Sequence, residues 1–256
     1  MRYEILGPLR VVEGEDVRTL SARKTEILLA ALLLRANQVV SIDQLIAEIW
    51  GETPPRRATA ALHVYISQLR KFLKRPGQSR SPIVTRAPGY QFELDPDDLD
   101  LERFTALVER GRSRARAHDH ERAVVDFKAA LGLWRGGLPL GPKVGGSILL
   151  GFLTWIEEVR LETIEMVIDS SLALGRHRTL IGQLFSLTAE YPMREAFHRQ
   201  LMLALYRSER QADALDVYRA ARGILNEQLG LEPCRALQEM HQSILLADRE
   251  LELRAA

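Results

Sequence analysis

The chain has 256 residues, of which 46% are hydrophobic and 27% charged, the ordinary balance of a globular protein large enough for two cores. No apolar run is long enough to cross a bilayer, and the N-terminus lacks a signal-peptide pattern. Because Cys234 is the single cysteine, an intrachain disulfide and a cysteine-based metal site are excluded, and we expect a cytoplasmic protein with no membrane contact.

The formal net charge of +1 conceals an uneven distribution along the chain. Residues 1–95 carry 14 basic and 10 acidic side chains, whereas residues 96–256 carry 21 and 24. Within Thr53–Phe92 there are eight basic residues and no carboxylate. Such a stretch favours binding to a polyanion, because a solvated surface helix usually interleaves both signs of charge.

The first 40 residues predict short strands followed by a helix. Tyr3–Val12 and Val17–Leu20 flank a turn and indicate a β-hairpin. Ser21 is placed to cap a helix over Lys24–Leu34, and Val39-Val40 is long enough only for a short strand.

Two further helices and a second hairpin complete the predicted N-terminal domain. Ser41 is an N-cap for a short helix that ends at Gly51. A third helix follows the Thr53-Pro54-Pro55 turn and extends to about Leu73. Its apolar residues recur at helical spacing and form one buried stripe: Leu62, Ile66, Leu69 and Leu73. Strands at Ile83-Val84-Thr85 and Tyr90–Leu94 then form a hairpin around Ala87-Pro88-Gly89.

The side of the third helix opposite the buried stripe has the composition of a DNA-reading surface. Basic side chains bind phosphates, whereas small and amide side chains read base edges. Gln68 suits adenine, Val64 a thymine methyl, and Ser67 either a base or a phosphate. Arg86, at the hairpin tip, suits an adjacent minor groove. The predicted DNA-binding residues are Arg56, Arg57, His63, Val64, Ser67, Gln68, Arg70, Lys71 and Arg86.

The remainder of the chain is helical in pattern. Asp95-Pro96-Asp97-Asp98 resembles a linker, and we place the domain boundary there, between a winged-helix domain at 1–95 and an all-helical domain at 96–256. Helix breaks are expected at Gly136-Gly137, Leu138–Gly151, Gly175, Tyr191-Pro192, Ser208 and Gly230–Pro233. Residues 174–177 align with 207–210 at an offset of 33, which places Phe185 against Tyr218. Ala123-x3-Phe127-x2-Ala130 also matches Ala214-x3-Tyr218-x2-Ala221. These spacings predict tetratricopeptide-like helix pairs.

The chain also resembles known regulator families. Leu62–Leu73 followed by Ile83–Tyr90 resembles the winged-helix effector domains of OmpR/PhoB-type response regulators. Leu6–Val11, together with Trp50-Gly51 and Pro54-Pro55, is similar to the opening of the Streptomyces antibiotic regulatory protein family. The C-terminal half resembles the bacterial transcriptional activation domain of that family, in the motifs Leu131–Gly136, Ala173–Arg176, Tyr191-Pro192, Arg194-Glu195, Leu201–Arg207, Gln211–Leu215 and Leu229–Pro233.

The resemblance implies an activator of an antibiotic or other secondary-metabolite gene cluster. Members bind direct repeats overlapping the promoter −35 region and engage RNA polymerase holoenzyme with its sigma factor. One winged helix reads too few base pairs for a genome-scale search, so a second copy is needed. Direct repeats imply that the two protomers bind in head-to-tail order, and we expect them at the nucleoid. Val64, Ser67, Gln68 and Arg70 occupy the family's recognition positions, and Arg86 matches its wing arginine. Gln68 and Ala60 stand where basic residues are common, and the glycine-rich Leu138–Gly151 also departs from the family.

Other function classes find little support in the sequence. The six histidines never combine with acidic residues at a metal-ligand spacing, no catalytic nucleophile pattern surrounds Cys234, and there is no phosphate-binding Gly-x4-Gly-Lys-Ser/Thr loop. We therefore predict no catalytic residues, no metal and no cofactor. The alternative to a specific activator is a tetratricopeptide-like scaffold that binds nucleic acid without sequence preference.

Overall fold

The computed structural model describes residues 1–74, 80–95, 98–136, 146–248 and 251. Within these residues the strands are β1 (Arg2–Glu4), β2 (Arg10–Glu13), β3 (Asp16–Arg18), β4 (Val39–Ser41), β5 (Ile83–Arg86) and β6 (Gly89–Phe92). The helices are α1 (Arg23–Leu34), α2 (Ile42–Trp50), α3 (Ala58–Phe72), α4 (Asp100–Arg116), α5 (His120–Leu131), α6 (Ser147–Ala173), α7 (His177–Glu190), α8 (Glu195–Tyr206), α9 (Gln211–Leu229) and α10 (Arg235–Leu245).

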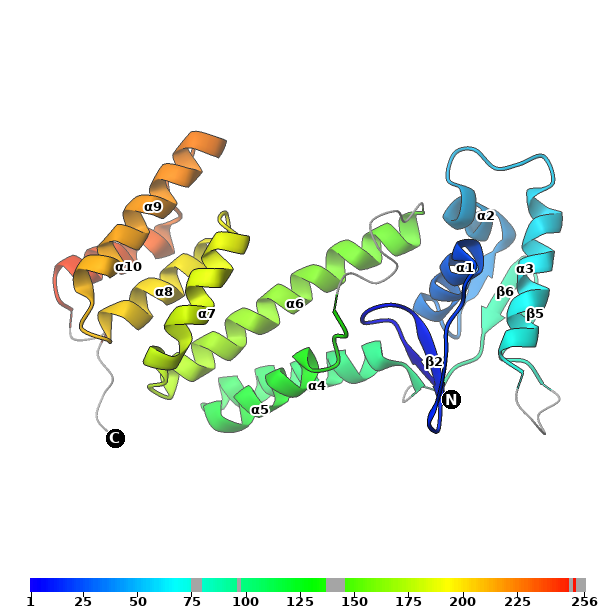
Figure 1. The fold of residues 1–256 in the computed structure, drawn as a ribbon, viewed down its shortest axis with the longest axis horizontal. Coiled ribbons are helices and arrows are strands. Elements are labelled where there is room, and N and C mark those ends of the chain that lie inside the picture. The colour runs from blue at the N-terminus through cyan, green and yellow to red at the C-terminus, as the bar shows by residue number, and fades with distance from the viewer. Residues whose placement is uncertain (75–79, 96–97, 137–145, 249–250, 252–256) are drawn as a thin grey trace. The chain divides into compact units, whose positions relative to one another are not determined.

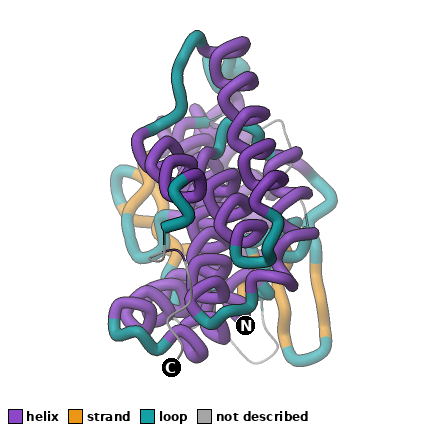
Figure 2. The backbone as a smooth tube through the Cα atoms, turned by 90° about the vertical axis from the view of Figure 1, so that its left-hand side faces the viewer, coloured by secondary structure: helices purple, strands orange, loops and turns teal. Residues whose placement is uncertain are grey.

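Contacts divide the chain into two compact units. Unit 1 comprises Met1–Leu107 and Ala129–Arg160, and unit 2 comprises Val108–Lys128 and Leu161–Ala256. Helices α4 and α6 each contribute residues to both units. Most of the described chain is helical and its strands are short, which confirms the predicted mainly α architecture (Figures 1 and 2).

The winged helix-turn-helix in unit 1 is built around α1. Every residue from Ile27 to Leu33 is buried, because α1 packs against α2, α3 and β6. Strands β4, β6 and β5 form a three-stranded antiparallel sheet in that order, and α3 lies beside the β5–β6 hairpin (Figure 1). The apolar stripe of α3 therefore faces a core, as its spacing predicts.

The ends of the two first helices show one confirmed and one wrong prediction. Ser41 caps α2 in a capping box, in which its hydroxyl accepts from the Gln44 N–H and the Gln44 side chain accepts from the Ser41 N–H. The predicted cap at Ser21 is wrong, since α1 begins after Ala22, whose side chain makes no capping bond. Thr25 instead donates its hydroxyl to the Ala22 carbonyl, at 2.7 Å.

The predicted strand Tyr3–Val12 is also wrong, because the chain reverses inside it. Strands β1 and β2 pair antiparallel with Tyr3 opposite Val11, and β3 follows β2 across the predicted hairpin turn. The reversal needs Gly7, whose φ of +139° suits glycine alone. It also needs Asp100, at the start of α4, whose carboxylate accepts from the N–H groups of Ile5 (2.9 Å) and Leu6 (3.0 Å).

Two motifs that the sequence singled out meet at this reversal. The Arg135 backbone N–H donates to the Leu6 carbonyl at 2.9 Å, and its guanidinium donates to the Pro8 carbonyl at 3.0 Å. The guanidinium also pairs with Glu4 at 3.2 Å. Burial raises the pKa of Asp100 above its usual value, against the lowering effect of the two backbone N–H groups and of Arg135. The Leu6–Val11 and Leu131–Gly136 motifs thus form one structural joint.

Unit 2 is a series of helix hairpins closed by a common turn. A residue with positive φ follows the first helix of each pair, namely His118, Gly175 and Glu209. The next N–H donates to the carbonyl five residues back, as from Arg176 to Ser171 and from Arg210 to Leu205, both at 3.0 Å. Gly175 therefore corresponds to Glu209 at an offset of 34, and the predicted offset of 33 is wrong by one residue.

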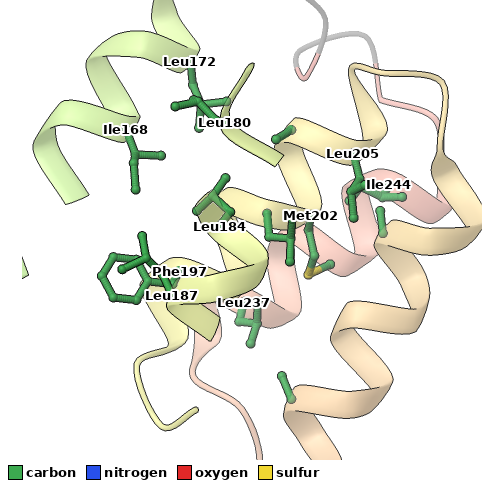
Figure 3. Close-up of a cluster of buried hydrophobic side chains, with 14 of the residues drawn as sticks. Ile168, Leu172, Leu180, Leu184, Leu187, Phe197, Met202, Leu205, Leu237 and Ile244 are labelled. Carbon is green, nitrogen blue, oxygen red and sulfur yellow. The ribbon is translucent and has the colours of Figure 1, made fainter. Parts of the chain in front are cut away.

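The corrected offset explains which side chains pack between the helices. Counted from the first residue of α5, α7 and α9, the same three positions carry Ala123, Phe127 and Ala130, then Leu180, Leu184 and Leu187, then Ala214, Tyr218 and Ala221. All are buried except the half-buried Tyr218. The match between α5 and α9 is confirmed, but Tyr218 corresponds to Leu184 and not to the exposed Phe185. Leu180, Leu184 and Leu187 pack on residues of α6, α8 and α10 in one apolar cluster (Figure 3).

The remaining helix breaks fall where the sequence predicts them, with one exception. Helices end before Gly175, Tyr191, Ser208 and Gly230 as expected. In the predicted break Leu138–Gly151, residues 147–151 belong to α6, and residues 137–145 lie outside the described residues.

Candidate nucleic-acid interface

Helix α3 presents two chemically different faces. Leu62, Ile66 and Leu69 are buried in unit 1, with exposed fractions of 1% or less. The opposite face is open, and the Val64 side chain is 54% exposed although it is apolar. An exposed valine costs little in stability, but it offers a methyl surface to a base edge. No acidic residue lies in the first turn of α3, and its last turn contains Arg70 and Lys71.

Contacts on both flanks hold α3 in place. Tyr65 stacks on Trp50 of α2 with ring centroids 5.9 Å apart, and the Lys24 ammonium lies 5.2 Å from the Trp50 ring. At the C-terminal end, Arg18 of β3 donates to the Phe72 carbonyl at 2.9 Å. A cation suits this end, where helix carbonyls lack partners. These contacts leave the open face of α3 to other molecules.

The β5–β6 hairpin forms the wing beside α3. Its register places Arg86 opposite Gly89 at the tip, and Arg86 is exposed. Gly89 lies against β4 so closely that a Cβ there would be 1.9 Å from the Val40 carbonyl oxygen. A larger residue would push the wing away from β4, so Gly89 sets where Arg86 is presented.

Arg70 connects α3 to the wing. Its Nε donates to the Ile83 carbonyl at 3.0 Å, and its Nη2 donates to the Thr85 hydroxyl at 2.9 Å. The guanidinium also lies 5.8 Å from the centre of the Tyr90 ring. Three contacts to β5 and β6 engage a side chain that the sequence assigned to DNA. The acceptor Thr85 carries no sequence signal, because an exposed strand threonine is ordinary.

The structure brings most of the predicted DNA-binding residues onto one region. His63, Val64, Ser67, Gln68 and Lys71 are exposed on α3, Arg56 and Arg57 are exposed just before it, and Arg86 is exposed on the wing. Arg70 is half-buried and faces the wing. Other basic residues also belong to the carboxylate-free stretch Thr53–Phe92. Among them, Arg80 pairs with Glu93 at 3.2 Å, and Arg75 lies outside the described residues.

Within the described part of the chain, no group of three or more His, Cys, Asp or Glu side chains is arranged to hold a metal ion. No helix there combines the length and apolar character that crossing a membrane requires. His118 and His120 lie edge to face, 5.9 Å apart, in the α4–α5 turn.

Two protein-family profiles match the chain. One is described as "Transcriptional regulatory protein, C terminal" and matches residues 15–92, and the other as "Bacterial transcriptional activator domain" and matches residues 99–245. The first covers α3 and the wing, and the second covers α4 to α10. Fold and site thus define a transcription regulator with an OmpR/PhoB-type winged helix and a helical activator domain.

Characterised relatives share both parts. The chain is 36% identical over 251 residues to the regulatory protein AfsR of Streptomyces griseus, and it is 34% identical over 254 residues to the regulatory protein DnrI of Streptomyces peucetius. It covers 25% of AfsR and 93% of DnrI, so it spans about a quarter of the length of the larger relative. The structure of Mycobacterium tuberculosis EmbR in complex with a low-affinity phosphopeptide superposes with a TM-score of 0.89 at 32% identity, over 96% of this chain and 65% of that one.

The chain belongs to the Streptomyces antibiotic regulatory protein family. Its two matched parts are those of a transcription regulator, a winged-helix domain and a bacterial transcriptional activator domain.

Proposed function

We propose that the chain activates transcription of an antibiotic or other secondary-metabolite gene cluster, by binding direct repeats near the −35 region and engaging RNA polymerase holoenzyme through its sigma factor. The observation that carries this proposal is the open face of α3, which joins exposed Val64, Ser67 and Gln68 to basic neighbours without a carboxylate. Residues 1–95 read DNA in this proposal, and residues 96–256 contact polymerase. The protein then acts at the nucleoid, in the cytoplasm.

The predicted site residues divide into three roles. Gln68, Val64 and Ser67 read base edges in the major groove, with His63 at their flank. Arg56, Arg57 and Lys71 bind phosphates and position the helix, and Arg86 enters the adjacent minor groove. Arg70 contributes charge to the same surface while it holds the wing.

Base reading is tested by comparing a specific site with random DNA. In gel-shift titrations with the full chain, Gln68→Ala should cost about 1–3 kcal/mol on the selected site and little on random duplex. Gln183→Ala, an exposed glutamine on α7, serves as the matched control. Equal losses on both duplexes would make Gln68 a backbone contact.

Phosphate binding is tested by the salt dependence of affinity. Lys71→Ala should reduce the slope of log affinity against log salt by about 0.9 and weaken all sequences alike. Lys128→Ala, an exposed lysine on α5, should leave the slope unchanged. A scaffold with only non-specific affinity, the second candidate function, would show the slope but no preference for any duplex.

Assembly on direct repeats is tested by their spacing. Two head-to-tail protomers one helical turn apart contact the same face of the duplex. Inserting about five base pairs, half a turn, rotates one protomer to the far side and should abolish cooperative binding. Mapping the genomic sites bound by the full chain shows whether they lie in a biosynthetic cluster.

A further inference from the structure

Glu48 is a buried acidic residue in α2, the first helix of the helix-turn-helix, and DNA contact does not explain it. Its exposed fraction is 1%. One carboxylate oxygen accepts from the Ile148 N–H at 2.6 Å, and the other accepts from the Leu149 N–H at 3.3 Å. Both donors belong to the first turn of α6, 100 residues further along the chain.

The first turn of α6 needs such an acceptor. The Leu150 N–H donates to the Gly146 carbonyl at 3.0 Å, so Gly146 stands at the N-cap of the helix. An N-cap side chain normally accepts from the second and third helical N–H groups, here those of Ile148 and Leu149. Glycine has no side chain, and Glu48 takes this role from another helix. Its negative charge also suits the positive end of the helix dipole.

Gly146 is matched to this arrangement. A Cβ at Gly146 would lie 2.2 Å from the Glu48 Cδ and Oε2 atoms, and 2.4 Å from the Glu48 Cα. Real Cβ atoms do not approach other atoms so closely, so any other residue would separate α6 from α2. A serine or aspartate, which would cap α6 locally, is therefore excluded by the contact that Glu48 makes.

A buried carboxylate is a poor choice for stability alone. Removing a charge from water is costly, and an apolar side chain of similar size often stabilises a core at least as well. Hydrogen bonds to two particular N–H groups add direction, because they hold the α6 axis at one orientation on α2. Beyond this contact, α6 continues as one helix to Ala173, in the activator domain.

We propose that Glu48 is a positioning residue for activation, which docks the start of α6 on the helix-turn-helix and so couples DNA binding to the activator domain. The activation part of this inference rests on the proposed function. The docking part does not, because it concerns contacts within unit 1 and predicts that DNA alone changes the protection of α6.

The experiment uses the full chain and four variants. Glu48→Ala removes the cap, and Gly146→Ala breaks the same contact from the α6 side while the winged helix stays intact. Glu52→Ala is the charge-matched control, because Glu52 is exposed just after α2. Gly151→Ala is the matched control on α6, because a Cβ there meets nothing within 4 Å. The DNA is the duplex that the wild-type chain selects from a random pool.

Three measurements are compared across these variants. Amide exchange at Ile148 and Leu149 should be at least about tenfold faster in Glu48→Ala and Gly146→Ala, and DNA should slow it in the wild type and controls alone. DNA affinity should fall by no more than the factor by which DNA slows exchange at Ile148 and Leu149 in the wild type, because coupling is reciprocal and Glu48 is buried against α6. Run-off transcription with purified polymerase should fall about tenfold in the two docking variants and stay unchanged in the controls.

The outcomes separate the two proposals. Docking variants with fast exchange and full transcription would overturn the coupling, as would a wild-type chain whose α6 amides ignore DNA. If the wild type activates nothing while DNA still slows exchange at Ile148 and Leu149, the proposed function fails and the coupling stands. If Glu48→Ala does not fold, Gly146→Ala decides between these results.

Discussion

The dual position of Arg70 permits a test that separates holding the wing from binding DNA. The sequence assigns Arg70 to the DNA surface, whereas its guanidinium donates to the Ile83 carbonyl and the Thr85 hydroxyl. Arg70→Ala removes both bonds and the charge. Arg70→Lys keeps the charge but places one ammonium where a planar fork made two bonds.

The magnitude follows from these contacts. Each hydrogen bond contributes about 0.5–1.5 kcal/mol net, and an exposed cation–π contact about 0.5–1 kcal/mol. Because Arg70 is half-buried and water replaces part of each bond, we expect Arg70→Ala to lower the free energy of opening the wing by about 1–2 kcal/mol. This corresponds to amide exchange about 5–30 times faster in β5 and β6.

Two measurements on the same variants decide the role. Amide exchange reports opening of the wing, and the salt dependence of DNA affinity reports phosphate contacts. If Arg70 chiefly holds the wing, Arg70→Lys accelerates exchange and leaves the salt slope unchanged. The neighbouring Lys71→Ala should show the reverse. A lower slope with unchanged wing exchange in Arg70→Ala would refute the reasoning and return Arg70 to the phosphate contacts.

Three further predictions concern the scaffold. Ser41→Ala removes the capping box of α2 and should lower the free energy of unfolding by about 1 kcal/mol in chemical denaturation; an unchanged midpoint would contradict the role of the cap. The hydrogen bond from Arg110, with the charges of Arg110 and Arg114, holds the pKa of the buried Asp126 below its usual value of 3.8. The stabilisation from ionised Asp126 is therefore present above pH 3.8 and is lost as pH falls through the lowered pKa. Asp126→Asn should lower the free energy of unfolding at pH 7, and the difference from wild type should shrink in acid. A difference that does not change with pH would argue against the ion pairs. A Cβ at Gly111 would lie 2.5 Å from the Phe127 ring, so Gly111→Ala should lower the free energy of unfolding by about 1–3 kcal/mol. A Cβ at Gly182 meets open space, so Gly182→Ala should be neutral or stabilise by up to about 1 kcal/mol. Thermal melts of both variants measure the difference.

The sequence predicted those features of the fold that depend only on residues close together along the chain. The stripe Leu62, Ile66 and Leu69 predicted both the helix and its buried side, because helical periodicity alone puts these residues on one face. Ser41 and the wing hairpin were predictable for the same reason, since caps and tight turns involve residues only a few positions apart. The open face of α3 was predictable because it is the side opposite the apolar stripe, and the residues expected there are exposed.

Other features depended on partners that no local pattern names. The residues of Tyr3–Val12 predict a strand, but the chain reverses at the point where Asp100 accepts from the N–H groups of Ile5 and Leu6. The repeat offset of 34 depended on which residue adopts positive φ, and both Gly175 and Glu209 do so. Residue type pointed to Gly175 but not to Glu209, because a glutamate rarely adopts that conformation.

Composition and periodicity were enough to predict the two kinds of domain, the buried face of α3 and the basic surface opposite it, because they are properties of short segments. The contacts of Glu48 and Arg70 could not be predicted from the sequence. A glutamate inside a helix is usually solvated and an arginine on a recognition helix usually contacts DNA, so both appeared ordinary in sequence. Their roles come from an α6 turn 100 residues away and from a strand 13 residues away, and such distant pairings are set by how the elements pack.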